Sequence, residues 1–196
     1  MGSAVNTTTI GVSIAVPEPY GRLLQDRRAS FGDPAASAIP THITLLPPTE
    51  VDPADLPAIR RHLARVAAQA RAFPIRLAGT DTFRPLTPVV YVSVADGGPS
   101  CAELQERIRS GPVHRDLQFP YHPHVTIAHG IPDPAMDHAQ SELSTFTAAW
   151  TALAFALYEQ SPDGVWQKTH DFPFGRPDPH PGVPHQHGSR TATRIS

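Results

Sequence analysis

The sequence predicts a soluble fold of mixed helices and strands, assembled from two halves that share one order of elements. Three observations support this. Several short segments alternate apolar and polar residues with the period of a strand, and segments between them repeat apolar residues every three or four positions, as amphipathic helices do. The tetrads HITL (42–45) and HVTI (124–127) occupy the same strand of each half. With 196 residues, 40% of them hydrophobic, the chain can bury one sizeable core or two small lobes.

The first half reads as strand, helix, strand, helix, strand. Residues 9–16, TIGVSIAV, alternate with period two, and residues 19–30 are expected to be helical. Residues 38–47, AIPTHITLLP, are a short apolar run between prolines, which favours a strand. The clearest helix spans residues 55–71, with Asp55 as a candidate N-cap. A strand over 73–84 completes this half.

The second half repeats this order and adds one strand. Ser100 begins SCAE, a capping-box signature in which Ser100 and Glu103 satisfy each other's backbone donors, and Gly111-Pro112 should end that helix. A proline at the first helical position predicts the start of the next helix at Asp133. The helix from Asp133 should run to about residue 144. The strands expected in this half are 88–94, 124–128, 148–158 and 165–170.

Two histidines stand where a buried strand would otherwise carry apolar residues. Residues i and i+2 of a strand project from the same face, so His42 lies beside Thr44 and His124 beside Thr126. A lone His-x-Thr is a weak signal, because a single histidine on an apolar strand is more often a packed core residue. Two copies at the same place in a repeated element order favour one site that receives both pairs.

These side chains suit chemistry at a phosphodiester. A base must take a proton from the attacking oxygen and an acid must give one to the leaving oxygen, and an imidazole, with a reference pKa of about 6.5, can do either. Hydroxyls can donate to the non-bridging oxygens and hold the phosphate in line. We therefore predict His42 and His124 as catalytic residues and Thr44 and Thr126 as phosphate binders, with no cofactor or metal. The assignment of acid and base stays open.

The two tetrads also resemble the paired signature of the two-histidine phosphoesterase superfamily, specifically its bacterial branch similar to 2′-5′ RNA ligases and cyclic phosphodiesterases. The resemblance covers about residues 8–174 and includes FRPLTPVVYVSV (83–94) and ALYEQSPDGVWQKTHDFPF (156–174). It implies an α+β, bilobal duplicated fold in which two antiparallel sheets form a central cleft and helices lie outside. It also implies metal-independent hydrolysis of 2′,3′-cyclic phosphate ends of nucleotides or RNA, of ADP-ribose 1″,2″-cyclic phosphate, or of 2′,5′-linked phosphodiesters.

The chain departs from that family at one position. Many members carry an arginine shortly after the second motif, where this sequence has Ala128-His129-Gly130. His129 could act as a hydrogen-bond donor in its place, or it could be an ordinary strand-end histidine.

We expect residues 1–174 to form the two-lobed domain and residues 175–196 to form a disordered tail. The tail is rich in proline and histidine and has few large apolar side chains, so burial cannot offset the entropy lost on ordering. Its histidines could bind a transition metal weakly, but a solvated segment is the simpler interpretation.

Other residues are weaker candidates for the site. His122 shares a face with His124, but suitably spaced further metal ligands are lacking in the sequence. Phe83, Tyr121 and Trp166 flank strand ends near the motifs and could stack on a base, although core packing is the default for aromatic residues. Cys101 reads as a packed small side chain. Surface positions are expected for His62, His114, His138 and His170.

Composition limits the location and the partners. The net charge of −2 argues against a long nucleic-acid platform, which would carry a basic stripe. An apolar run near the roughly 20 residues of a membrane span is missing, so no membrane partner is expected. A single cysteine and an N-terminus unlike a signal peptide favour the cytoplasm. We expect a monomer whose substrate is a small cyclic nucleotide or an RNA 3′ end.

The sequence is also compatible with three other functions. The same groups can join RNA ends to a 2′,5′ linkage, the reverse of hydrolysis. A non-catalytic module could keep the cleft to hold a nucleotide or an RNA end, although binding alone does not require two titrating groups. A third possibility is a structural or partner-binding role for the tail.

Overall fold

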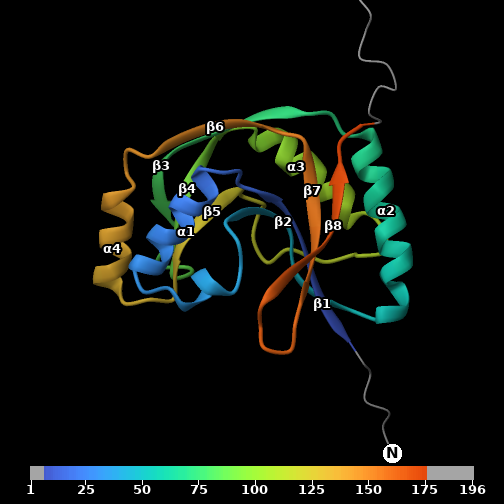
Figure 1. The fold of residues 1–196 in the computed structure, drawn as a ribbon, viewed down its shortest axis with the longest axis horizontal. Helices are drawn as coiled ribbons and strands as arrows, with labels where there is room; N and C mark the ends of the chain where they lie inside the picture. Colours follow the sequence, from blue (N-terminus) through green and yellow to red (C-terminus); the bar gives the residue numbers. More distant parts are fainter. Residues whose placement is uncertain (1–6, 176–196) are drawn as a thin grey trace, which may run out of the picture.

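Two antiparallel sheets of four strands each form the centre of the computed structural model, which describes residues 7–175 (Figure 1). The strand order is β2-β1-β7-β8 in the first sheet and β5-β4-β3-β6 in the second. The predicted α+β fold with two antiparallel sheets is confirmed. The strands are β1 (Thr8–Ala15), β2 (His42–Val51), β3 (Phe73–Thr82), β4 (Val89–Asp96), β5 (His124–His129), β6 (Thr147–Ala152), β7 (Ala154–Gln160) and β8 (Trp166–Pro173).

Helices surround the sheets. Helix α4 packs on β3, β4 and β5, and α2 packs against β8 and α3, so α4 and α2 lie at opposite ends of the molecule (Figure 1). Within residues 7–175, no helix is both long enough and apolar enough to cross a membrane. The helices are α1 (Tyr20–Ser30), α2 (Leu56–Gln69), α3 (Gly98–Arg109) and α4 (Asp133–Glu142), with short 3-10 turns at Pro34–Ser37 and Pro53–Asp55.

Each sheet combines strands from distant parts of the chain. Strand β7 directly follows β6 but pairs with β1, and β3 leaves the first half of the chain to pair with β4. The helices are exchanged too, since α1 contacts β5 and α3 contacts β2. As a result β1 and β2 take the places in the first sheet that β4 and β5 take in the second. The two histidine strands, β2 and β5, are the edge strands at equivalent positions.

The single strand predicted over 148–158 is wrong, because the chain breaks at Leu153 into β6 and β7. Leu153 is 64% exposed, and the burial pattern differs on its two sides: Ala148 and Ala152 are the buried residues of β6, whereas residues 155–158 of β7 are all buried. The segment is apolar on both faces, so its sequence hides the break.

The start of α3 also differs from the prediction. The helix begins at Gly98, its N-cap is Gly97, and no side chain caps it, so the capping box at Ser100 does not form. Gly97 has a φ of 94°, and a Cβ there would lie 2.7 Å from the Pro74 carbonyl oxygen. A left-handed glycine therefore turns the chain into the helix before Ser100 is reached.

The predicted starts of α2 and β2 need smaller corrections. Asp55 stands at the N-cap position of α2 but makes no capping hydrogen bond, because the preceding 3-10 turn is capped by Asp52 instead. Strand β2 begins at His42 rather than at residue 38, since the 3-10 turn Pro34–Ser37 and the bend after it occupy the earlier positions.

Candidate active site

The first His-x-Thr pair lies on the edge strand β2. Ile43 and Leu45 are 0% and 1% exposed and face the core, so the alternation of the strand turns His42 and Thr44 to the opposite side. Both side chains are half-buried. In the pairing with β1, Ser13 stands opposite Thr44. The first pair thus projects from the sheet as the sequence predicts.

The second pair repeats this arrangement on β5. Val125 and Ile127 are both 0% exposed and face the core, while His124 and Thr126 are half-buried on the other side. Strand β4 supplies the cross-strand neighbours, with Ser93 opposite His124 and Tyr91 opposite Thr126.

Three of the four predicted residues lie around one cleft. Strands β2 and β5 contact each other, and His42 and Thr44 of β2 line one pocket. Thr44 and His124 line the same cavity, and the Tyr121 hydroxyl before β5 donates to the Thr44 carbonyl oxygen at 2.8 Å. Thr126 is placed by its strand alone, on the His124 side of β5.

The backbone fixes the tautomer of both histidines in the same way. Nδ1 of His42 lies 2.7 Å from the carbonyl oxygen of Pro40, and Nδ1 of His124 lies 2.8 Å from that of His122. A carbonyl oxygen only accepts, so each Nδ1 must carry the proton. Each neutral ring is left with an unprotonated Nε2 that can bind or move a proton.

Both imidazoles lie in surroundings that favour the neutral form. Burial, the largest cause, lowers the pKa of His42 to about 4, and the charges of Arg28 and His124 lower it further against the raising effect of the Pro40 carbonyl. The pKa of His124 is also lowered, mainly by burial and then by His122, while the His122 carbonyl opposes the shift.

The depressed pKa of His42 makes the stability of the fold depend on pH. In the unfolded chain His42 takes up a proton near pH 6.5, whereas in the folded chain it does so only near pH 4, so unfolding gains a proton between these values. We expect acidification through this window to lower the free energy of unfolding by up to about 3 kcal/mol. Urea titrations at several pH values measure it. His42→Asn, which keeps a donor for Pro40 but cannot titrate, should show a shallower dependence, and an unchanged slope would contradict the shift.

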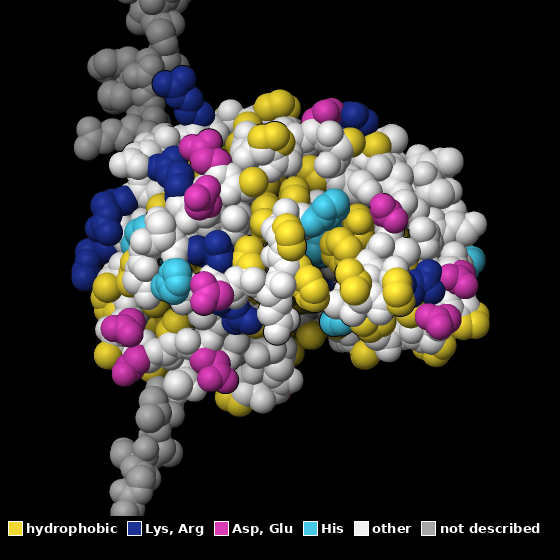
Figure 2. All heavy atoms as spheres, turned by 180° about the vertical axis from the view of Figure 1, so that it is seen from behind, with side chains coloured by type: hydrophobic (Ala, Val, Ile, Leu, Met, Phe, Trp, Pro, Cys, Tyr) yellow, Lys and Arg dark blue, Asp and Glu magenta, His cyan; other side chains and the backbone are white. Residues whose placement is uncertain are grey.

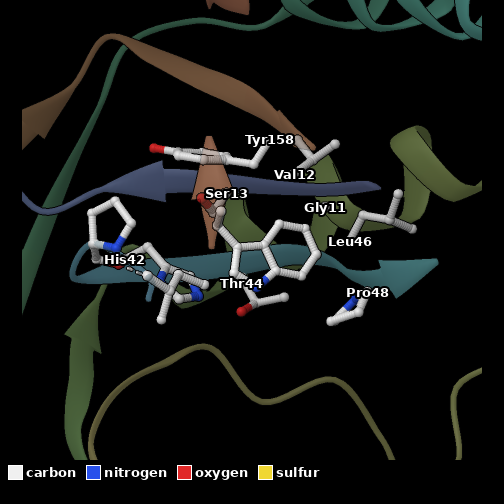
Figure 3. A pocket seen from close by; sticks show the side chains of 11 residues that line it. Gly11, Val12, Ser13, His42, Thr44, Leu46, Pro48 and Tyr158 are labelled. Carbon is white, nitrogen blue, oxygen red and sulfur yellow. Dashed lines mark hydrogen bonds between the residues drawn. The ribbon is translucent and has the colours of Figure 1, made fainter. Parts of the chain in front are cut away.

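A small pocket of about 40 Å³ lies on the His42 side of the cleft. Figure 3 shows Ser13 and Tyr158 near each other, with His42 and Thr44 along β2. The pKa of the Tyr158 hydroxyl is raised mainly by burial, and the nearby Ser13 opposes this shift. Trp166 packs closely over Gly11, where a Cβ would come within 3.2 Å of the indole ring.

A larger cavity of about 540 Å³ lies on the His124 side. Phe83 meets the His124 ring edge to face at 5.0 Å between centroids and also packs on Tyr91 at 4.4 Å. Phe119 lines the cavity and is 54% exposed. On the face drawn in Figure 2, hydrophobic side chains gather along the middle with histidine among them, and most charged side chains lie to either side. The cavity thus offers aromatic surface next to an imidazole.

The structure places the remaining predicted residues as follows. Phe83, Tyr121 and Trp166, the candidates for stacking, all line one of the two cavities. Within residues 7–175, no group of three or more His, Cys, Asp or Glu side chains could hold a metal ion. The ring centroids of His122 and His124 lie 6.4 Å apart. The histidines of the tail lie outside the described residues.

Two lesser predictions are settled by burial. Cys101 is a packed side chain, 0% exposed, and burial raises its pKa to about 12. The surface position expected for His62 is wrong: its Nε2 lies 3.1 Å from the Arg107 carbonyl oxygen and 3.0 Å from that of Ile108, so the ring joins α2 to the end of α3. His114, His138 and His170 are exposed, as predicted.

Sequence reasoning missed a buried ion pair beside the site. Arg28 of α1 is 5% exposed, and its Nε donates to Asp33 Oδ2 at 2.7 Å. The same oxygen accepts the backbone N–H of His129 at 3.0 Å. The only signal in the sequence is the spacing of Arg28 from Gly21 and Leu24, which places it on the buried face of α1.

Comparison with known proteins identifies the family. The family model described as "2′-5′ RNA ligase superfamily" matches residues 16–164 of this chain. The chain belongs to this superfamily. The resemblance to two-histidine phosphoesterases predicted from the two tetrads is thereby confirmed.

Relatives and solved structures agree with this membership. A provisionally named phosphoesterase of Bacillus thuringiensis is 27% identical over 162 residues, which cover 79% of this chain and 92% of the relative. One from Halalkalibacterium halodurans is 26% identical over 121 residues, 62% of this chain and 70% of that protein. E. coli LigT complexed with 3′-AMP has a similar fold, with a TM-score of 0.64 and 17% identity over 86% of this chain and 99% of LigT.

Proposed function

We propose that this protein is a metal-independent phosphodiesterase that uses His42 and His124 as acid and base. Its substrates would be 2′,3′-cyclic nucleotides or RNA ends, ADP-ribose 1″,2″-cyclic phosphate, or 2′,5′-linked phosphodiesters. The observation that carries the proposal is the matched pair of imidazoles, each with Nδ1 bound to the carbonyl two residues earlier and Nε2 left to react. Membership of the 2′-5′ RNA ligase superfamily supports phosphoesterase chemistry.

Hydrolysis of a cyclic phosphate needs two proton transfers at this site. One neutral Nε2 takes a proton from water as its oxygen bonds to phosphorus, and the other imidazole, protonated beforehand, gives its proton to the ribose oxygen as the ring P–O bond breaks. The free cleft favours neutral rings, because both pKa values are lowered. A bound phosphodiester brings a negative charge that favours protonation of an adjacent imidazole, so substrate binding itself promotes the required pair of states.

The threonines would hold the phosphate between the rings. A hydroxyl at Thr44 and another at Thr126 can donate to the two non-bridging oxygens, which fixes the phosphorus in line with the attacking water. The same hydrogen bonds strengthen as negative charge develops on those oxygens in the transition state.

The larger cavity would receive the nucleoside. Its volume of about 540 Å³ falls within the range of small-molecule sites, and Phe83, Phe119 and Tyr121 supply rings on which a base can stack. Structures of E. coli LigT are titled as complexes with 3′-AMP, ATP and NADP+, which supports a nucleotide as the ligand class.

Phe119→Ala tests the nucleoside cavity, because this ring is exposed and has no described contact with His124. Loss of one stacking platform should raise KM for adenosine 2′,3′-cyclic phosphate by about tenfold and leave kcat within a few fold. Steady-state kinetics measure both constants. Leu153→Ala, at an exposed apolar residue between β6 and β7, is the control. An unchanged KM for Phe119→Ala would show that the base binds elsewhere.

The function as a whole is tested with a panel of substrates in excess EDTA. It contains the four nucleoside 2′,3′-cyclic monophosphates, ADP-ribose 1″,2″-cyclic phosphate and a 2′,5′-linked dinucleotide. Turnover of at least one is expected. Loss of turnover in EDTA would overturn the metal-free mechanism, and tight nucleotide binding without turnover would point to a binding module.

End joining is the second candidate, favoured by the superfamily itself, since 2′,5′ ligation is the reverse of hydrolysis and uses the same groups. RNA with a 2′,3′-cyclic phosphate end, incubated with a 5′-hydroxyl acceptor, would give a longer product if the protein ligates. Chain length on a denaturing gel separates this activity from hydrolysis.

A further inference from the structure

The two sides of the cleft differ in size, which gives the two histidines different neighbours. Beside His42 a pocket lined by Trp166 holds about 40 Å³, which is enough for water and too small for a nucleoside. Beside His124 the cavity holds about 540 Å³ and is lined by aromatic rings. The nucleoside, whose ribose oxygen is released as the ring P–O bond breaks, therefore fits the His124 side, and an attacking water fits the His42 side.

Helix α1 is attached to both histidine strands. At its start, the Thr41 hydroxyl, one residue before His42, lies 3.1 Å from the Gly21 carbonyl oxygen and 2.7 Å from Gln25 Oε1. At its end, the Arg28–Asp33 pair reaches the last residue of β5, His129. The helix thus spans the gap between the strand that carries His42 and the strand that carries His124.

Asp33 is the centre of the second attachment. Its side chain is 1% exposed, and its oxygens accept three hydrogen bonds: from Arg28 Nε at 2.7 Å, from the Ala35 N–H at 2.9 Å and from the His129 N–H at 3.0 Å. A buried carboxylate with three donors and an opposite charge is well compensated, so the pair holds its geometry.

Arg28 also acts on the site through its charge. Four groups surround His42. They are Arg28 of α1, His124 of β5, the hydroxyl of Tyr158 on β7, and the carbonyl of Pro40 just before β2. Of these, Arg28 carries the fixed positive charge, and it opposes the protonation of His42. A base must start the reaction unprotonated.

We propose that Arg28, held by Asp33, is a positioning residue that fixes the end of α1 against β5 and gives His42 the role of general base, with His124 as the acid. This inference rests on the proposed phosphodiesterase function. The oppositely charged members of the pair make it testable, because removing Arg28 should raise the pKa of His42 whereas removing Asp33 should not, while a purely structural ion pair would give two variants with the same defect.

The test follows His42 directly by NMR titration of its ring in full-length protein, which requires no turnover. Arg28→Met should raise the pKa of His42 by about 0.5 or more on the pH scale, Asp33→Asn should lower it or leave it unchanged, and Arg28→Lys should stay near the wild type. If Arg28→Met and Asp33→Asn move it the same way, or if neither moves it, the inference is wrong.

A second variant covers the case in which a single change prevents folding. Arg28→Met combined with Asp33→Asn removes both buried charges at once, and its His42 pKa should follow the loss of Arg28 and rise. An unchanged or lower value would overturn the inference.

In kcat/KM profiles with a cyclic nucleotide, Arg28→Met should lose activity mainly at acidic pH, whereas equal loss at every pH would indicate a structural role only. Absence of turnover in the wild type would refute the proposed function but leave the NMR result valid.

Discussion

Replacement of His42 or His124 by alanine is expected to lower kcat for a cyclic phosphate substrate by about 10²–10⁴-fold, because each variant loses one of two proton transfers. The double variant should be only slightly slower than the slower single variant, since the two groups act in the same step. KM should change less than kcat. Single-substrate kinetics in EDTA, with circular dichroism to verify folding, give these values.

His114→Ala is the matched control for the histidine variants. The His114 side chain is 78% exposed, so its loss should leave kcat unchanged. Activity within threefold of the wild type in either site variant would show that the corresponding ring is not an acid or a base. Loss in His124→Ala alone would indicate a single-histidine mechanism and a different role for His42.

Removal of the hydroxyl from Thr44 or Thr126 is expected to have the next largest effect. Valine keeps the branched shape that β2 and β5 accommodate and removes only the donor to the phosphate. A lost hydrogen bond to developing charge should lower kcat by about 10²-fold in Thr44→Val and in Thr126→Val. The same assay measures both variants.

Serine variants at the same positions provide the control. Thr44→Ser and Thr126→Ser keep a hydroxyl and should retain most of the activity. Equal activity in the valine and serine variants would show that the hydroxyls do not bind the phosphate, and the repeated threonines would then be strand residues only.

The local part of the site could be predicted from the sequence, because strand alternation is a property of neighbouring residues. Ile43 and Val125 are apolar and buried, and this is sufficient to turn His42 and His124 out of the core. The identical motif in both halves then indicated a common site. The expectation that both strands meet at a cleft required the resemblance to a family as well.

Features that depend on distant contacts could not be predicted. Asp33 and His129 are 96 positions apart, and no local pattern indicates that a carboxylate after α1 binds the end of β5. The passage of the chain from β6 in the second sheet to β7 in the first depends on a break at Leu153, which a segment apolar on both faces conceals. The missed start of α3 has the same origin, since Gly97 is required by the nearby Pro74 carbonyl.

The two-histidine mechanism is tested most directly by the pH dependence of kcat/KM for adenosine 2′,3′-cyclic phosphate in excess EDTA. We predict a bell-shaped profile with its acid limb near the His42 pKa of about 4 and its maximum below pH 6.5, because both histidine pKa values are lowered in the free protein. A profile without two limbs, or turnover that EDTA abolishes, would contradict the mechanism.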